Sequence, residues 1–344
     1  MTLRGALLGV GNVAMNAHVP GWLARPEVEL VAAADVCHGG RAAFLDAVPL
    51  ARWYDSADEL LHAERLDFVD VCTPPSTHAP IARLALSLSL HVLCEKPLVA
   101  RPEELGPLVE LARSQDRVLF TVHNWVFAPI LEKLLAVVRA GAVGRVRNVA
   151  WRTLRSRPAA TAAQEGARNW RTTPELAGGG ILVDHGWHAF YVLLGLVGEE
   201  PETVRARLVN QLDPGAPLED TAEAEIGFRS ATAHVFLTWA ADERRNVVEV
   251  HGTEGTLLLD GDSLELSRVG EARTERWTFS QSLAHGSHHP EWFDGVARGF
   301  LREAADPRAR GANLTEAALC VSLLAAANES SARGGEWLPL PRLF

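Results

Sequence analysis

The feature that most constrains this chain is a glycine-containing turn close to its N-terminus. An apolar segment at 3–9 runs into Gly9-Val-Gly11-Asn-Val-Ala14, and a helical pattern follows over 13–24. Glycines at this spacing allow a tight strand-to-helix turn and let a dinucleotide pyrophosphate approach the backbone at the helix N-terminus. Ala14 takes the third small position, which the fingerprint permits. The expected cofactor contacts are Gly9, Gly11, Asn12 and Val13. The alternative is a plain turn whose glycines serve only geometry.

Strand-like and helix-like segments alternate over the first 122 residues. Predicted strands lie at 3–9, 28–35, 68–73, 91–95 and 118–122. Predicted helices lie between them, at 13–24, 40–47, 57–63, 77–87 and 102–114. Strands separated by helices form βαβ units, so this α/β segment predicts a doubly wound parallel sheet with helices on both faces. A chain of 344 residues has room for a second domain, at ~150 residues per domain.

The pattern changes after about residue 140. Successive strands are predicted at 145–155, 203–210, 222–228, 231–240, 246–252, 256–259, 263–267 and 274–279. Turn signals rather than helices separate the later ones, which favours a mostly antiparallel sheet in an α+β domain. One long helix is expected over about 181–195, and two more near 291–304 and 314–332. The last of these begins with Asn313-Leu-Thr-Glu316, which resembles a capping box.

An acidic residue stands where a dinucleotide site would use one. Asp35 ends the second predicted strand, 24 residues past Gly11, at the position expected to bond an adenosine ribose. Its carboxylate would repel a 2′-phosphate, so NAD is favoured over NADP, although Arg41 lies nearby.

Two loops follow neighbouring strands of the predicted parallel sheet. Thr73-Pro-Pro-Ser-Thr-His78 follows the fourth strand and Glu95-Lys96-Pro97 the fifth, and ligands of such sheets bind outside the carboxyl ends of the strands. The chain has 31 arginines but only two lysines, Lys96 and Lys133. Because lysine can release a proton whereas arginine does not, Lys96 is a candidate for proton chemistry. The alternative is a solvated Glu95–Lys96 pair at a strand end.

A glycine run and an acid–histidine pair open the long helix of the second half. Asp184 and His188 are four residues apart in Gly178-Gly-Gly-Ile-Leu-Val-Asp184-His-Gly-Trp-His188, so they share one helix face. A histidine beside a carboxylate can serve as a general acid or base. The alternative to a catalytic role is an ordinary Asp–His pair on a helix surface. His185, between them in the sequence, lies on a different helix face.

Composition excludes several other classes of function. A net charge of −10 argues against a nucleic-acid partner, and no apolar run approaches the ~20 residues of a membrane helix. The four cysteines lack CxxC spacing, which argues against a disulfide framework. The N-terminal pattern predicts a strand rather than a signal peptide. A cytoplasmic protein is therefore expected. No metal is expected: His285, His288 and His289 lack matched partners and favour a loop beside the active site.

These motifs together resemble the Gfo/Idh/MocA oxidoreductases, the family of glucose–fructose oxidoreductase and inositol dehydrogenase. The resemblance continues through His251-Gly-Thr-Glu-Gly255 to the last helix. It implies a Rossmann domain at 1–122 and a substrate-binding α+β domain at 123–310 with a large open sheet. It also implies a helix and tail at 311–344 that pack back on the Rossmann domain. The open sheet implies a homodimer or homotetramer.

The resemblance also implies roles for individual residues. Lys96 would bond the reacting hydroxyl, His188 would take its proton, and Asp184 would contact the substrate or orient His188. Thr73, Pro74, His78, Glu95 and Lys96 would line or support the dinucleotide site. The residues expected to contact the substrate are Lys96, Trp125, Arg171, Asp184, His185 and His188. Trp125 stands where many members carry arginine, so a polar substrate contact is expected to be absent there.

The expected function is an NAD-dependent oxidoreductase acting on a secondary hydroxyl or ketone of a sugar, cyclitol or related polyol. Two alternatives stay open within the same resemblance. One is redox-neutral chemistry, in which transient oxidation by NAD permits glycosidic cleavage or elimination. The other is a non-catalytic, NAD-binding regulator, against which the intact set of Lys96, Asp184 and His188 argues.

Overall fold

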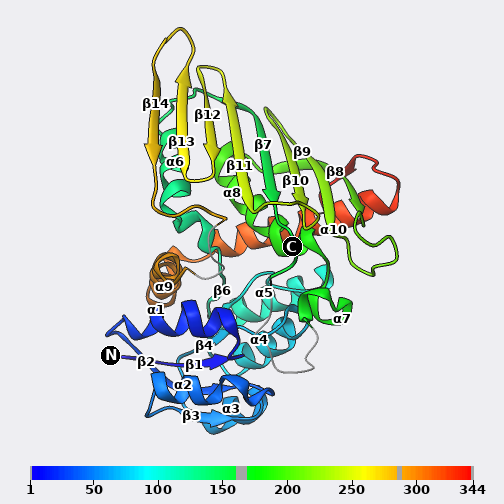
Figure 1. Cartoon of the computed structure of the whole chain (residues 1–344). Coiled ribbons are helices and arrows are strands. Elements are labelled where there is room, and N and C mark those ends of the chain that lie inside the picture. The colour runs from blue at the N-terminus through cyan, green and yellow to red at the C-terminus, as the bar shows by residue number, and fades with distance from the viewer. Residues whose placement is uncertain (1, 160–168, 285–288, 342–344) are drawn as a thin grey trace.

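The protein is built on two β-sheets with helices between them and around them (Figure 1). The structure is a computed structural model, and it describes residues 2–159, 169–284 and 289–341. One sheet lies in the N-terminal part and is parallel, and the other is larger and mostly antiparallel. The predicted fold class is therefore confirmed.

The first sheet has six strands in the order β3-β2-β1-β4-β5-β6, and all neighbouring pairs are parallel. The strands are β1 (Leu3–Leu8), β2 (Val28–Ala34), β3 (Arg52–Tyr54), β4 (Phe68–Val71), β5 (His91–Cys94) and β6 (Leu119–Thr121). The helices are η1 (Ala14–His18), α1 (Val19–Leu23), α2 (Arg41–Ala47), α3 (Ala57–Ala63), α4 (His78–Ser87) and α5 (Leu105–Ser114). The strand order reverses between β1 and β4, which is where such sheets bind a ligand.

The second sheet has nine strands in the order β14-β13-β12-β11-β7-β10-β9-β8-β15. The strands are β7 (Val146–Leu154), β8 (Pro201–Val209), β9 (Thr221–Phe228), β10 (Thr232–Thr238), β11 (Arg245–Gly252), β12 (Gly255–Asp260), β13 (Ser263–Arg268), β14 (Thr274–Thr278) and β15 (Leu338–Pro339). The central pair β7–β10 is parallel, whereas the pairs on either side are antiparallel.

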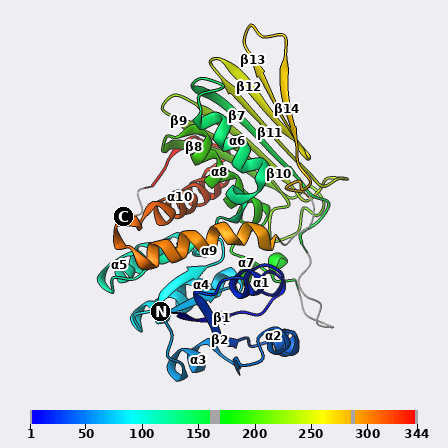
Figure 2. The same cartoon turned by 90° about the vertical axis from the view of Figure 1, so that its left-hand side faces the viewer.

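Helices cover one face of the second sheet and leave the other open (Figure 2). The covering helices are α6 (Pro129–Arg139), α8 (Trp187–Val197) and α10 (Ala312–Ala332). In β9, Ala224 and Ile226 are buried against them, while Glu223 points to the open face. This alternation is what a sheet with one buried face requires.

Helix α9 (Pro290–Ala305) joins the two parts of the molecule. Its Phe293 and Phe300 pack around Trp22 of α1 and so lie in the core of the first sheet. Helix α10 reaches the first sheet at its start, where the Asn313 side chain bonds both the N–H and the carbonyl of Thr121. The predicted capping box at Asn313 is therefore wrong, since the helix already begins after Gly311.

Several elements departed from the sequence prediction. Strands β3 and β15 and helix α6 were not expected. The long helix predicted over 181–195 is divided into a π-helical segment, η7 (Leu182–Gly186), followed by α8. A stretch over Pro174–Val197 is long and apolar enough to cross a membrane by length and composition, but 78% of its most apolar window is buried inside the protein.

Candidate active site

The two glycines of the N-terminal turn have different physical reasons to be there. Gly9 has φ +90°, and a Cβ at this position would meet the Thr73 backbone nitrogen at 2.7 Å. Gly9 is therefore needed where β1 ends against the loop after β4. A Cβ on Gly11 would meet nothing within 4 Å. The chain itself leaves the space beside Gly11 open, which fits a dinucleotide lying against the backbone from Gly11 to Val13.

Asp35 lies beside this turn and is bound by backbone groups. Its carboxylate oxygens accept hydrogen bonds from the N–H groups of Val10 and Cys37, both at 2.7 Å. These bonds fix the carboxylate at the end of β2. Each oxygen keeps a second lone pair, so Asp35 can still accept from a ribose hydroxyl.

The loops after β4 and β5 are tied to each other by a buried histidine. The His78 ring nitrogens lie 2.7 Å from the Pro97 carbonyl oxygen and 2.8 Å from that of Thr73. His78 has no exposed surface, so it positions the loops rather than contacting a ligand. Thr73 and Pro74 keep exposed surface at the loop and stay predictions as cofactor contacts.

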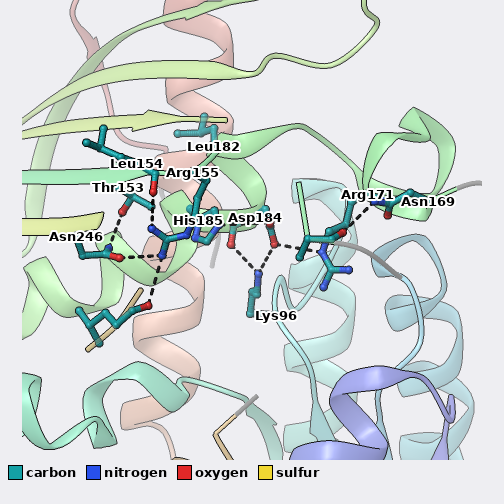
Figure 3. A network of polar contacts seen from close by, with 12 residues as sticks. Lys96, Thr153, Leu154, Arg155, Asn169, Arg171, Leu182, Asp184, His185 and Asn246 are labelled. Atoms are coloured by element: carbon teal, nitrogen blue, oxygen red, sulfur yellow. Dashed lines mark hydrogen bonds and ion pairs between the residues drawn. The ribbon is translucent and has the colours of Figure 1, made fainter. Parts of the chain in front are cut away.

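Lys96 and Asp184 join the loop after β5 to the π-helical segment η7 across the two domains (Figure 3). The Lys96 ammonium Nζ donates to Asp184 Oδ1 at 2.9 Å and to the Asp184 carbonyl oxygen at 2.6 Å. Both side chains are 14% exposed, so the pair is largely shielded from water. Burial alone would raise the pKa of Asp184, but Lys96, then His185 and Arg171, hold it well below its usual range.

The helix start that carries Asp184 is held by a residue that the sequence did not reveal. The Glu219 carboxylate accepts from the N–H groups of Gly180 and Leu182, both at 3.0 Å. A Cβ on Gly180 would meet the Glu219 carbonyl oxygen at 2.0 Å, so a glycine here lets the helix start lie close to the Glu219 backbone. The π-helical segment then turns Asp184 toward Lys96, and such segments are frequent at functional sites.

Two further predicted residues flank this pair. Arg171 Nε lies 3.8 Å from Asp184 Oδ1, and its guanidinium stacks over the Trp170 ring at 4.3 Å. His185 Nε2 lies 3.7 Å from Asp184 Oδ2. Burial lowers the pKa of His185 to about 3, so its ring is neutral near pH 7.

His188 is held by two residues other than Asp184. Its Nδ1 lies 2.8 Å from the Tyr191 hydroxyl, and the Trp125 ring stacks on it with centroids 4.4 Å apart and planes 10° apart. Asp184 makes no hydrogen bond to His188 within the described residues, so the interpretation that it orients His188 directly is wrong. Tyr191 carried no signal in the sequence. Trp125 is buried and backs the imidazole.

A small pocket opens in front of the Lys96–Asp184 pair. It is lined by Pro75, Lys96, Pro97, Trp170, Arg171, Ala177, Gly179, Val183 and Asp184. A larger hollow lies on the open face of the second sheet, away from these residues.

Two buried polar clusters surround the site without lining this pocket. Below Glu95, His18 lies between the carboxylates of Asp70 and Glu95. Behind His185, the buried Arg155 donates to the Asn246 side chain and to backbone carbonyls (Figure 3).

One buried group of side chains has atoms close enough together to ligate a metal ion, although the sequence predicts no metal. Across the described ranges, the residues that could hold an ion are His18, Asp70 and Cys72. His18 and Cys72 already bond to the Asp70 carboxylate, and so does the Trp22 indole N–H. His285 and His288 lie outside the described residues, while the His289 ring stacks on Trp292.

Two regions of the chain match models of known protein families. Residues 3–123 match the oxidoreductase family with an NAD-binding Rossmann fold, and residues 131–258 match the GFO/IDH/MocA C-terminal domain. The chain is 32% identical over 197 residues to D-glucoside 3-dehydrogenase of Escherichia coli, which covers 56% of this chain and 54% of that protein. It therefore spans about half the length of that relative.

Two further matches extend over more of the chain. Myo-inositol 2-dehydrogenase of Thermotoga maritima is 26% identical over 266 residues, which covers 75% of each protein. The crystal structure of GenD2 from gentamicin A biosynthesis in complex with NAD is 26% identical, with a TM-score of 0.83 over 99% of this chain and 97% of that one. Because the two family regions together match more than half of the sequence, the protein belongs to the GFO/IDH/MocA family of NAD-binding oxidoreductases.

Proposed function

We propose that this protein is an NAD-dependent dehydrogenase that interconverts a secondary hydroxyl and a ketone on a sugar, cyclitol or related polyol. The observation that carries the proposal is the Lys96–Asp184 pair at the mouth of a pocket, with His188 one helical turn further along. Relatives named for D-glucoside and myo-inositol oxidation support this substrate class.

The residues around the pocket have separate roles in such a reaction. When bound, NAD supplies the acceptor for a hydride. Lys96 keeps one ammonium hydrogen free after its two bonds to Asp184, and in the reduction direction this hydrogen can bond the ketone oxygen. Asp184 holds the ammonium in place, while Arg171 and Trp170 form a polar and an apolar wall for a polyol. Positioned proton transfer of this kind contributes roughly 10²–10⁴-fold to a rate.

A spectrophotometric screen tests the proposal. Purified protein is mixed with NAD or NADP and a panel of sugars, inositols and sugar acids, and formation of reduced nicotinamide is recorded. Reduced nicotinamide with NAD and one polyol class is the expected result. No signal across the panel, with NAD binding demonstrated separately, contradicts the proposal.

Product analysis separates net oxidation from the two alternatives. A redox-neutral enzyme would yield a cleaved or dehydrated sugar without free reduced nicotinamide. A regulator would bind NAD and convert no sugar. The buried acid–base groups around Lys96 support turnover, since a regulator has no chemical need for them.

We further infer that the open face of the second sheet binds a second copy of the chain. That face carries interspersed charges of both signs, including Arg152, Arg207, Glu223 and Glu249, so a rotated copy could match arginines with carboxylates. Light scattering should give a dimer or tetramer, and Glu223→Arg with Glu249→Arg should dissociate it. A monomeric wild type contradicts this inference.

A reducing, cytoplasmic location is proposed as well. The four cysteines are all unpaired in the structure, which suits a compartment that keeps thiols reduced. Fractionation of the native cells with compartment markers tests this location.

A further inference from the structure

We propose that Tyr191 fixes His188 as a neutral hydrogen-bond donor to the reacting oxygen, which leaves Lys96 as the group that exchanges the proton. The proposal rests on the proposed function and deepens it. It reassigns the proton-accepting role that the family resemblance gave to His188 and makes Tyr191 a positioning residue.

The Tyr191 hydroxyl has two nitrogen neighbours. The backbone N–H of Trp125 lies 3.0 Å from this oxygen, and His188 Nδ1 lies 2.8 Å from it. A backbone N–H can only donate, so the phenol oxygen accepts from Trp125. The phenol proton is therefore available for His188.

Because the Tyr191 hydroxyl and the His188 ring are buried, an unpaired proton on either would be costly. Tyr191 is 1% exposed, and its hydroxyl has no other partner among the described residues. If His188 Nδ1 carried a proton and donated it to the phenol oxygen, the phenol O–H would be left without an acceptor. A buried unsatisfied donor costs about 1–3 kcal/mol. The favoured state has Tyr191 donating to an unprotonated Nδ1, so the proton of the neutral ring is on Nε2.

The surroundings of both groups keep them uncharged. Burial, followed by Lys96 and His185, lowers the pKa of His188 well below its usual range. His123, beyond Tyr191, also lowers this pKa, and Asp184 is the opposing charge. Burial raises the pKa of Tyr191 well above its usual value, so the phenol keeps its proton.

The imidazole is also fixed in orientation. Trp125 stacks parallel to it on one side, and Tyr191 holds Nδ1 on its edge. Nε2 makes no hydrogen bond to any described residue, and it is absent from the buried atoms that lack a partner. This N–H is therefore the part of His188 that can reach a ligand. A neutral imidazole that polarises a substrate oxygen is a known catalytic arrangement.

A neutral His188 cannot also be the proton carrier. If it gave up the Nε2 proton, it would leave a buried imidazolate, or a buried tyrosinate if the Tyr191 proton followed. Lys96 does not have this difficulty, because its ammonium form is paired with Asp184. In oxidation, bound NAD would accept a hydride from the substrate carbon, and the Lys96 side chain, acting as an amine, would take the hydroxyl proton. A ketone, the reduced cofactor and the Lys96 ammonium would result, and the ammonium would then release its proton to water.

Nitrogen NMR of protein labelled with ¹⁵N-histidine tests the tautomer without substrate or cofactor. The His188 signals are identified by their loss in His188→Gln. The expected result is an unprotonated Nδ1 and a protonated Nε2 from mildly acidic to alkaline pH. Tyr191→Phe should populate the Nδ1–H form, whereas Tyr54→Phe, at the other tyrosine, should leave the signals unchanged. A protonated Nδ1 in the wild type, or an imidazolium near neutral pH, overturns the proposal.

Kinetics with a substrate from the screen tests the division of roles. Glutamine can place an amide N–H near the position of Nε2 but cannot carry a proton. His188→Gln should therefore keep kcat within about tenfold of the wild type, while His188→Ala should lose roughly 10²–10³-fold. Equal losses in both variants overturn the proposal. If no polyol is turned over, the proposed function fails, and the NMR result still decides the tautomer.

Discussion

His18 and Asp70 form a buried pair beneath the cofactor loops, with His18 Nδ1 2.9 Å from Asp70 Oδ2. The other ring nitrogen, Nε2, lies 3.1 Å from Glu95 Oε1. Carboxylates accept hydrogen bonds but do not donate them, so both ring nitrogens must carry protons if both carboxylates are ionised. Burial would lower the pKa of His18, but Asp70 and Cys72 raise it well above its usual value. The positive ring therefore supports Glu95 from below.

This pair predicts a pH-dependent contribution to stability. A raised pKa in the folded state means that the contribution is complete below the unfolded value of 6.5 and is lost as pH rises through the folded pKa. At pH values below 6.5, His18→Gln should lower the free energy of unfolding by about 3–5 kcal/mol, because two buried carboxylates lose their cation. Urea unfolding of wild type and variant across a pH series measures the difference, which should shrink toward alkaline pH.

An exposed histidine provides the control for this measurement. His62 lies on the surface beside Asp58, and His62→Gln should change stability little at any pH. A His18→Gln effect that stays constant with pH would contradict a charged His18 and place the proton on a carboxylate instead.

Replacement of Lys96 should separate chemistry from cofactor binding. Lys96→Ala is expected to lower kcat by about 10²–10⁴-fold while the Kd for NAD stays nearly the same, because the amine lies toward Asp184 and the pocket. Added primary amines should restore part of kcat. The other lysine, Lys133, packs over the Trp277 ring, so Lys133→Ala should keep full activity. Loss of NAD binding without loss of kcat in Lys96→Ala would show that this role is wrong.

The two turn glycines should respond differently to the same substitution. Gly9→Ala places a Cβ 2.7 Å from the Thr73 nitrogen at a φ of +90°, so it should cost about 1–3 kcal/mol of stability or more. Gly11→Ala meets no atom of the chain, so its Tm should be close to that of the wild type. Its new methyl group should instead weaken NAD binding. Calorimetry and NAD titration measure both quantities, and a Gly11→Ala protein with unchanged NAD affinity would contradict the placement of the cofactor.

Local patterns in the sequence were enough to predict the order of most elements and the residues at the strand ends. The glycine turn, Lys96 and Asp184 each carry their signal within a few residues. Strand β3 was missed because three residues, Arg52–Tyr54, are too short to show a period.

The remaining site residues depend on contacts between distant segments. Glu219 binds the N–H groups of Gly180 and Leu182 from a loop more than thirty-five residues later. Tyr191 reads as one apolar residue of a buried helix until the fold brings Trp125 to its hydroxyl. The capping box failed for the same reason, because the Asn313 side chain bonds β6 instead.

Asp35 should govern the choice between NAD and NADP. Its carboxylate is fixed by the Val10 and Cys37 N–H groups at the end of β2, where a 2′-phosphate would meet a negative charge. Asp35→Asn keeps an acceptor oxygen but removes the charge, so the ratio of kcat/KM for NADP over NAD should rise by roughly 10–100-fold. Asp46→Asn, on helix α2, removes an acidic charge elsewhere in the same domain and should leave the ratio unchanged. An unchanged ratio in Asp35→Asn would mean that the cofactor preference is set by other residues, with Arg41 the first to examine.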